Sequence, residues 1–589
     1  MDRDITSLLE QLRHGGISRR RFIKTAGLLG LSMGAIDALL AGCAPTPETI
    51  KETVVMEKEV EVTRVVEVEK EKEVVVTATP EPTAAPATEP KKGGVLHISL
   101  NNWPKVLHPV HDSGTEGLYV QKQIRDGLYN VGEDGQMTPG LAVGHDQPDD
   151  VTYIFHLREG VKFHDGSDFT ADDVIWTLDL LRGQTPITST HAKWAEPAIA
   201  SYEALDKYTV KVVLSEPWID FIPMMWADKN MSITKKDYVL KLGDDFGHKG
   251  DMGTGPFMFK EWVKGERLVL ERNPNYWGAG ETGMPYVDEI EYRAIGEGST
   301  NILSFLTGET DIMLDPPLKD VTPLQGQEGV NVQHMAAGDE KNMTLNTTIP
   351  PFDNQKVRQA IYYGIDRQTI MDVVYYGWAV ASQAFVPPQH WAHPKDADFY
   401  PYDPDKAASM LAEEGYTKDN PLQFELVTVN VTEYVDIATL IQNQLAQIGV
   451  EVTVTPMEKS GWVSRVWPVE GTANPAFQAS VYRSKGHVVT TNYTFRRYHS
   501  TGNLNETGVN LPGGHQVPEL DEILEQAWGE MDHDKARELY IKANEILMDA
   551  AVYISLGWQE NINVSHEYVK DLPIFIQDTM PLRGVWLDV

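Results

Sequence analysis

Cysteine is almost absent from this chain of 589 residues, because the sequence contains only one, Cys43. A single cysteine excludes a disulfide within the chain and a zinc site built from several thiolates. A chain of this length buries most of the surface that its unfolded state exposes, so it does not need disulfides to be stable. The folded body is therefore expected to depend on an apolar core.

Positive charge is also scarce. The chain has 51 Lys and Arg residues against 86 Asp and Glu residues, which gives a formal net charge of −35 at pH 7. A negative field of this size repels the phosphate backbone of nucleic acids and anionic lipid headgroups. The composition therefore argues against a nucleic-acid partner, although it does not fix the sign of a binding site.

Motifs of common enzyme sites are missing as well. From Gly93 onward no segment has the context of a nucleophile elbow, a His-Glu-x-x-His helix, a phosphate-binding loop or a dinucleotide-binding loop. Asp172 and Asp173 follow Thr170 at the expected start of a helix, where acidic side chains stabilise its positive end. We expect a protein with no catalytic residues and no cofactor, and an exported hydrolase is the disfavoured alternative.

The N-terminus combines an export signal with an anchoring site. Arg19 and Arg20 precede a mildly apolar run from Thr25 to Ala41, which resembles a twin-arginine signal for proteins exported in the folded state. Leu40-Ala41-Gly42-Cys43 resembles a lipobox, in which cleavage makes the cysteine the first residue and acylation follows. Residues 1–42 are thus expected to be a signal peptide. A membrane-spanning signal anchor is the disfavoured alternative, because the run is short for a span of about 20 residues.

Residues 43–92 are expected to form a tether that begins with the lipidated Cys43. The segment is first rich in Val, Glu and Lys and then rich in Pro, Thr and Ala, and valines are poor helix formers. As a flexible chain it reaches roughly 40 Å, which lifts a folded body off the headgroups. The expected location is the outer face of the cytoplasmic membrane, with the body held by its lipid.

From Gly93 onward, strand patterns alternate with helix patterns, which indicates an α/β fold. Residues 403–415 have the capping Asp, the first-turn Pro and the terminal Gly of a helix. Apolar residues recur at helical spacing over 437–448, and valines alternate over 450–454 as in a half-buried strand.

Motifs spread over almost the whole body carry a resemblance to a known family. The most specific block runs from Tyr153 to Gly166 and continues from Phe169 to Val174. Further matching segments, in order along the chain, are Gly93–Ile98, Arg125–Tyr129, Gly253–Phe257, Asn273–Trp277, Leu306–Asp311 and Pro351–Ile361. Together they resemble the family 5 extracytoplasmic solute-binding proteins of ABC importers, which include oligopeptide, dipeptide, nickel and oligosaccharide binders.

The resemblance implies a two-lobed periplasmic-binding-protein fold that closes on its ligand about a hinge. The implied boundaries are 93–342 for lobe 1, with an extra subdomain at about 131–249 and completion by 558–589, and 343–557 for lobe 2. The hinge would lie near Asn346 and Leu556, where the chain crosses between the lobes. The monomeric receptor would deliver its solute to the permease of an ABC importer, and a sensory receptor with the same fold is the alternative.

Six residues are candidates for contacts with the solute. They are Asn101, Asn102 and Trp103 of lobe 1, and Trp391, Tyr482 and Arg483 of lobe 2. Aromatic rings with a few polar groups suit a general solute pocket, although core packing is an equal alternative for both tryptophans.

The segment around Arg483 departs from the family. In the peptide-binding members an acid follows the matching arginine and pairs with the amino terminus of the peptide, and no acid follows Arg483. A buried ammonium group without a partner costs several kcal/mol, on the order of 3 or more. We therefore expect neutral, ring-bearing or capped solutes, such as oligosaccharides, rather than free peptide amines, unless another carboxylate substitutes.

Two histidine pairs leave a metal-binding alternative open. His108 and His111 are three residues apart, as are His390 and His393, which would suit a metal ion if the segments were helical. Prolines near both pairs favour loops instead. No metal site is therefore assigned, and a nickel or metal-chelate binder remains an alternative at the level of the family.

Overall fold

The structure is a computed structural model, described over residues 89–111, 114–132, 136–189, 198–227, 232–280, 283–336, 339–468, 476–484, 491–573 and 580–589. The expected signal peptide, Cys43 and the tether up to residue 88 lie outside these residues. None of the helices within these ranges is both long enough and apolar enough to cross a membrane.

The first large sheet has seven strands in the order β12-β19-β11-β1-β10-β9-β8. Its strands are β1 (Val95–Leu100), β8 (Phe257–Val263), β9 (Arg267–Arg272), β10 (Glu289–Ala294), β11 (Ile312–Leu314), β12 (Val330–Met335) and β19 (Asn561–His566). Central strand β1 runs parallel to β10 and β11. Leu96, Ile98 and Leu100 of β1 share a buried cluster with Val120 and Ile124 of α4 (Gly114–Ile124). Helices α8 (Gly298–Leu306) and α9 (Leu318–Leu324) follow β10 and β11.

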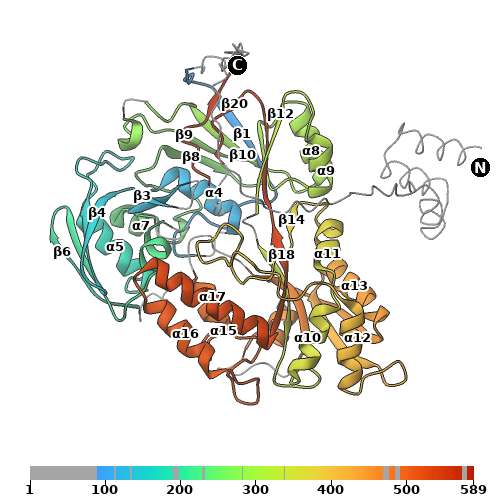
Figure 1. Ribbon diagram of the computed structural model, residues 1–589. Coiled ribbons are helices and arrows are strands. Elements are labelled where there is room, and N and C mark those ends of the chain that lie inside the picture. The colour runs from blue at the N-terminus through green and yellow to red at the C-terminus, as the bar shows by residue number, and fades with distance from the viewer. Residues whose placement is uncertain are drawn as a thin grey trace, which may run out of the picture. The chain divides into compact units, whose positions relative to one another are not determined.

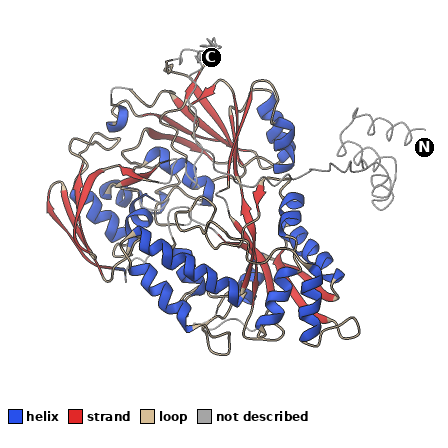
Figure 2. Cartoon of the chain, in the orientation of Figure 1, coloured by secondary structure: helices blue, strands red, loops and turns tan. Residues whose placement is uncertain are grey.

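The second large sheet has six strands in the order β14-β18-β13-β17-β15-β16 (Figure 1). Its strands are β13 (Glu340–Leu345), β14 (Ala379–Val380), β15 (Leu422–Val429), β16 (Val450–Met457), β17 (Ala479–Ser484) and β18 (Tyr553–Gln559). The helices that accompany it are α10 (Gln355–Tyr363), α11 (Arg367–Val374), α12 (Pro404–Glu413), α13 (Thr432–Gln447), α14 (Lys459–Val466), α15 (Asn492–Tyr498), α16 (Pro518–Gly529) and α17 (His533–Ala550). Figure 2 shows these helices flanking the strands.

The helix and strand predicted for this region are confirmed. Helix α12 begins at Pro404, and the Asp403 carboxylate accepts the Lys406 N–H at 2.9 Å, as expected of a capping residue. The apolar pattern over 437–448 belongs to the longer helix α13, and strand β16 follows it.

A third sheet has a core of its own and is called the subdomain here. Its antiparallel strands, in the order β4-β5-β7-β6, are β4 (Ala142–Asp149), β5 (Thr152–Leu157), β7 (Thr209–Leu214) and β6 (Ile199–Asp206). Helices α5 (Ala171–Leu181) and α7 (Lys236–Leu242) and the short turns η1 (Pro223–Ala227) and η2 (Gly243–Asp245) accompany it. Asp173 accepts the Thr170 N–H at 2.9 Å and lies 3.0 Å from the Lys235 ammonium, so it stabilises the helix start as predicted.

Smaller elements complete the chain. They are the hairpin β2 (Tyr129–Val131) and β3 (Met137–Pro139), the turn η3 (Trp277–Ala279), and the pair β20 (Val569–Lys570) and β21 (Trp586–Leu587). We call the first large sheet with the subdomain lobe 1, and the second large sheet with its helices lobe 2.

The chain crosses between the two large sheets twice. The first crossing lies between Met335 of β12 and Glu340 of β13, and the second is Glu560, between β18 and β19. The predicted crossings, near 343–346 and 553–558, instead lie inside the second sheet. The cause is the pairing of β13 with β18, which holds both strands in that sheet up to the pair Glu340 and Trp558.

Candidate functional site

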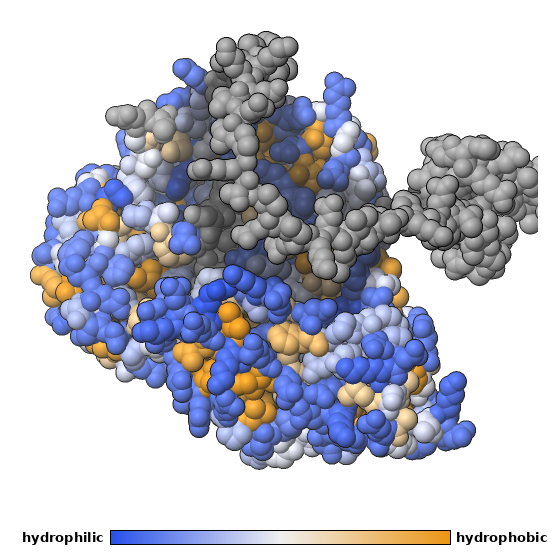
Figure 3. Space-filling model, in the orientation of Figure 1, coloured by the Kyte–Doolittle hydropathy of each residue, from blue (hydrophilic) through white to orange (hydrophobic). Residues whose placement is uncertain are grey.

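Both large sheets direct the carboxyl ends of parallel strands toward the crossings. In lobe 1, β11 ends at Leu314, which pairs with Asn563 near the start of β19. In lobe 2, β15, β16 and β17 are parallel, and β17 ends at Ser484, which pairs with Glu340 beside the first crossing. Ligands of open α/β sheets bind at such ends. Figure 3 shows mostly hydrophilic residues over the face in view, with hydrophobic residues scattered among them.

Two ion pairs lie at this edge of lobe 2. The Arg483 guanidinium, near the end of β17, contacts the Asp339 carboxylate in the first crossing. Asp339 raises the pKa of Arg483 above its usual range, so this pair stays ionised. The Lys341 ammonium lies 2.7 Å from Glu433 Oε1, with the Lys341 side chain 2% exposed and the Glu433 side chain 31% exposed. Each cation therefore has a carboxylate partner.

Four aromatic rings surround the ion pairs. The Lys341 ammonium lies 5.4 Å from the ring centroid of Tyr375 and 5.7 Å from that of Tyr434. The Tyr434 and Tyr482 ring centroids are 5.0 Å apart, and the Trp462 and Tyr482 ring centroids are 4.4 Å apart. Rings at these distances favour a cation and exclude water from it. We refer to Asp339, Lys341, Tyr375, Glu433, Tyr434, Tyr482 and Arg483 as the lobe 2 cluster.

The Glu433 carboxylate is held through its Oε1 atom. Lys341 and the Tyr375 hydroxyl, which donates a short hydrogen bond, both contact Oε1. The Glu433 side chain is 31% exposed, so part of the carboxylate remains accessible. Glu433 stands in the first turn of α13, just after the carboxyl end of β15. The arrangement leaves a fixed acceptor for a donor from another molecule.

Lobe 1 places Asn101, Asn102 and Trp103 at the carboxyl end of β1. Asn101 Nδ2 donates to the Asp315 carbonyl oxygen at 2.9 Å, which ties the end of β1 to the end of β11. Asn102 is exposed, and its Nδ2 lies 3.4 Å from an oxygen of Glu116 on α4. Trp103 is half-buried against the lobe 1 core. This end of β1 therefore offers polar groups beside a partly packed ring.

Comparison with known proteins decides the family. The model of the bacterial extracellular solute-binding proteins, family 5 Middle, matches residues 136–505. The chain belongs to this family. The glutathione-binding protein GsiB of Escherichia coli (strain K12) is 27% identical over 456 residues, which cover 76% of this chain and 86% of that protein. GsiB of Salmonella typhimurium (strain LT2) is 31% identical over 369 residues, which cover 62% and 69%.

Solved structures agree on the fold of this family 5 protein. The ABC transporter-associated periplasmic binding protein DppA from Helicobacter pylori, in complex with peptide STSA, matches with a TM-score of 0.69 and 26% identity over 85% of this chain and 99% of its own. HbpA2 from Haemophilus parasuis matches with a TM-score of 0.74 and 23% identity over 84% and 100%. The predicted family and two-lobed periplasmic-binding-protein fold are confirmed, and the chain is a solute-binding protein of an ABC importer.

The remaining predicted residues of this solute-binding protein lie in packed surroundings. The Trp391 ring lies 5.1 Å from His533 and 5.8 Å from Tyr540 of α17, which is the core-packing role. Leu556 is fully buried within β18 and Asn346 is fully buried directly after β13, so neither lies in a crossing. A contact between Trp391 and a solute, and a hinge role for Asn346 and Leu556, stay predictions.

The histidine pairs take part in local contacts. The His108 and His111 rings stack with centroids 4.0 Å apart, and His111 Nε2 lies 2.8 Å from the Thr188 carbonyl oxygen. His393 Nε2 lies 3.3 Å from the Ser382 hydroxyl, and His390 Nδ1 accepts the Ala392 N–H at 2.9 Å. Over the described ranges no group of three or more His, Cys, Asp or Glu side chains is placed to hold a metal ion.

Most of the lobe 2 cluster was missed by sequence reasoning. Asp339, Lys341, Tyr375 and Glu433 come from three separate segments, so no spacing links them. No apolar run marked the strand of Lys341 either, because β13 reads Glu-Lys-Asn-Met-Thr-Leu although every residue in it is buried. No acid follows Arg483 in the sequence, and the carboxylate beside its guanidinium in the structure belongs to Asp339, from another segment of the chain.

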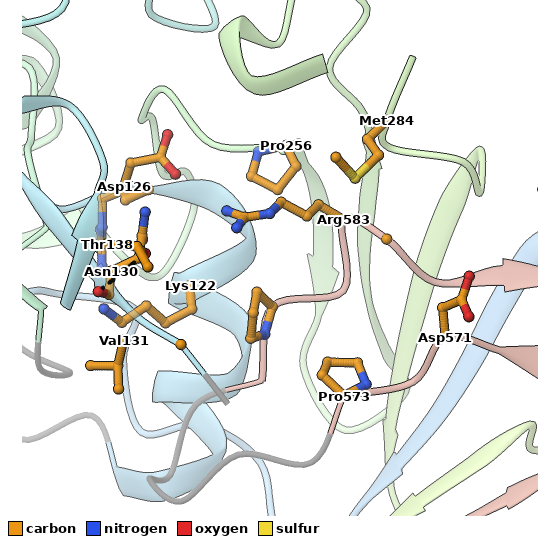
Figure 4. A pocket seen from close by; sticks show the side chains of 14 residues that line it. Lys122, Asp126, Asn130, Val131, Thr138, Pro256, Met284, Asp571, Pro573 and Arg583 are labelled. Atoms are coloured by element: carbon orange, nitrogen blue, oxygen red, sulfur yellow. Dashed lines mark hydrogen bonds between the residues drawn. The ribbon is translucent and has the colours of Figure 1, made fainter. Parts of the chain in front are cut away.

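Lobe 1 also contains a cavity of about 330 Å³ between the end of α4 and the C-terminal segment (Figure 4). The charged residues of its wall are Lys122, Arg125, Asp126, Asp571 and Arg583. Asp126 accepts hydrogen bonds from Thr254 Oγ1 and Trp277 Nε1, both at 2.8 Å, and burial raises its pKa. All the lining residues belong to lobe 1, so this cavity is separate from the edge where the lobes meet.

Proposed function

We propose that this protein is a lipid-anchored receptor that captures a peptide-like solute with a free amino group and delivers it to an ABC importer. The observation that carries the proposal is the lobe 2 cluster, in which Asp339 and Glu433 are carboxylates fixed by Arg483 and Lys341. An ammonium or amide N–H that reaches the Glu433 carboxylate gains a charged acceptor that is already oriented.

The chemistry of this edge supports a donor-rich solute. Both cations of the cluster already have carboxylate partners, so they offer little to a solute carboxylate. The partly exposed acceptors are the carboxylates themselves. The tyrosine rings around them suit the aliphatic part of a peptide-like molecule. The names of the relatives agree with this choice, since GsiB is a glutathione-binding protein and DppA was solved with a peptide.

A solute with a free amino group therefore replaces the capped or sugar solutes that the sequence led us to expect. That expectation rested on the missing acid after Arg483, and Asp339 now stands beside that guanidinium. Oligosaccharides become the comparison ligands of the test. Nickel chelates belong in the same comparison, because the family includes nickel binders.

Calorimetric titration tests the proposal with glutathione, free tetrapeptides, the same peptides N-acetylated, and oligosaccharides. We expect free amines to bind and acetylation to weaken binding by about tenfold or more, because it removes a charge-assisted hydrogen bond. Glu433→Gln should weaken binding of the free peptides and not of the acetylated ones. The control is Glu413→Gln, an exposed glutamate on α12. Tight binding of an oligosaccharide with no response to any peptide would overturn the proposal.

Membrane attachment through Cys43 and delivery as a monomer complete the proposal. The sequence pattern Leu40-Ala41-Gly42-Cys43 supports acylation, and the tether that follows leaves the body room to reach a permease. Intact mass of the membrane-extracted protein gives the number of acyl groups, and light scattering gives the oligomeric state.

A further inference from the structure

The subdomain contacts lobe 2 through residues that are far in the sequence from either crossing. Residues 217–221, which follow β7, meet Thr491 before α15 and Trp528 near the end of α16. Figure 1 shows α16 and α17 reaching the subdomain on the side of lobe 2 away from α11 and β14. At the crossing end the lobes already contact through Trp378, whose indole N–H donates to Thr322 Oγ1 at 3.2 Å. The lobes therefore touch at two separate places.

Asp220 makes the polar part of this second contact. Its Oδ2 atom accepts the Thr491 N–H at 2.6 Å and the Thr491 hydroxyl at 2.9 Å. Asp220 and Thr491 are each 1% exposed. A carboxylate buried to this degree needs such donors, because a buried charge that loses its hydrogen bonds is strongly unfavourable. Both donors come from the other lobe, so separation of the lobes removes them together.

Trp218 makes the apolar part. Its ring stacks on Trp528 with centroids 5.4 Å apart and planes inclined by 4°. The Ile219 N–H donates to the Trp528 carbonyl oxygen at 3.2 Å. Trp528 and Met531 pack against the core of the subdomain although they belong to lobe 2. The contact thus combines stacking, burial and three directional hydrogen bonds.

We infer that this contact is a latch that holds the lobes closed and sets how long the solute is retained. Rotation about the two crossings moves apart surfaces that lie far from them, so opening breaks the Asp220 and Trp218 contacts. A contact made only in the closed state raises the closed fraction, and apparent affinity scales with that fraction. Asp220, Thr491 and Trp218 are positioning residues, because they act through closure rather than by touching the solute.

The inference goes beyond the proposed function, since it requires no particular solute. Its first test is an interlobe distance measured without solute on the full-length chain. Spin labels on Asp244→Cys in the subdomain and Glu522→Cys on α16, both exposed positions, report the separation once Cys43 is replaced by Ser. We expect a short and a longer distance population in the otherwise unchanged protein, and a smaller short population after Asp220→Ala or Trp218→Ala.

Matched variants separate the latch from general destabilisation. Thr491→Val removes the hydroxyl donor and should enlarge the longer-distance population, whereas Thr491→Ser keeps both donors and should not. Asp150→Ala, an exposed aspartate of the same subdomain, is the control. If Asp220→Ala does not fold, the comparison of Thr491→Val with Thr491→Ser takes its place. An unchanged distance distribution in the folded Thr491→Val and Trp218→Ala variants overturns the latch.

The rate of solute release is the second measurement, with glutathione as the probe. Loss of the Asp220 acceptor should speed glutathione release by about fivefold or more, with a smaller change in the association rate. Failure of glutathione to bind would count against the proposed function and leave the distance test to decide on the latch.

Discussion

Lys341 and Glu433 form an ion pair, and substituting each residue separately should give unequal losses of stability. In Glu433→Gln the Lys341 ammonium, only 2% exposed, loses its anion and remains buried, at a cost of about 3 kcal/mol. In Lys341→Met the apolar stem is kept, and the Glu433 carboxylate that remains is 31% exposed and is hydrated by water. The expected cost of Lys341→Met is therefore about 1 kcal/mol.

Urea unfolding followed by circular dichroism measures both costs, together with the double variant. The double variant should cost less than the sum of the two single variants, because neither charge is then left alone. The exposed substitution Glu413→Gln is the control, with an expected change within about 0.5 kcal/mol. The reasoning is refuted if Lys341→Met costs as much as Glu433→Gln, since the inequality rests on which partner is buried.

Three further predictions concern pH, motion and anchoring. His164 accepts from the Gly253 N–H and faces the Gly255 carbonyl oxygen, and burial lowers its pKa from 6.5 to about 4. As the pH drops, the unfolded state therefore binds a proton at His164 before the folded state does. The free energy of unfolding should fall between pH 6.5 and 4, and His164→Asn should reduce that fall in acid unfolding curves. Saturating solute should lower the radius of gyration in small-angle scattering, and no change would contradict closure about the crossings. Cys43→Ala should remove the protein from the membrane fraction or leave it uncleaved, and an unacylated native Cys43 in intact mass would contradict the anchor.

Local signals allowed much of the fold to be predicted. Asp403 and Pro404 mark the start of α12 because capping and a fixed φ act within a few residues. Thr170 and Asp173 mark α5 in the same way. The family resemblance supplied the two-lobed arrangement, which no local pattern contains.

The ends of strands that pair with distant parts of the chain were harder to predict. The crossing positions depend on how far β13 and β18 pair, and that pairing joins residues about two hundred positions apart in the chain. The lobe 2 cluster is another such case, because Arg483 meets Asp339 only through the ladder of β13 and β17. Of the six predicted solute residues, Tyr482 and Arg483 lie in this cluster, where the structure adds their partners.

The strand order β12-β19-β11 has a consequence for synthesis of the chain. Strand β19 begins at Asn561 and lies between β11 and β12, which were both made more than two hundred residues earlier. A ribosome-bound or truncated chain that stops before Asn561 leaves the edges of both strands without their partner, and such edges pair with other chains. Lobe 1 therefore becomes complete only once β19 has been made, and a nonsense mutation before Asn561 should yield an aggregate rather than a shorter receptor.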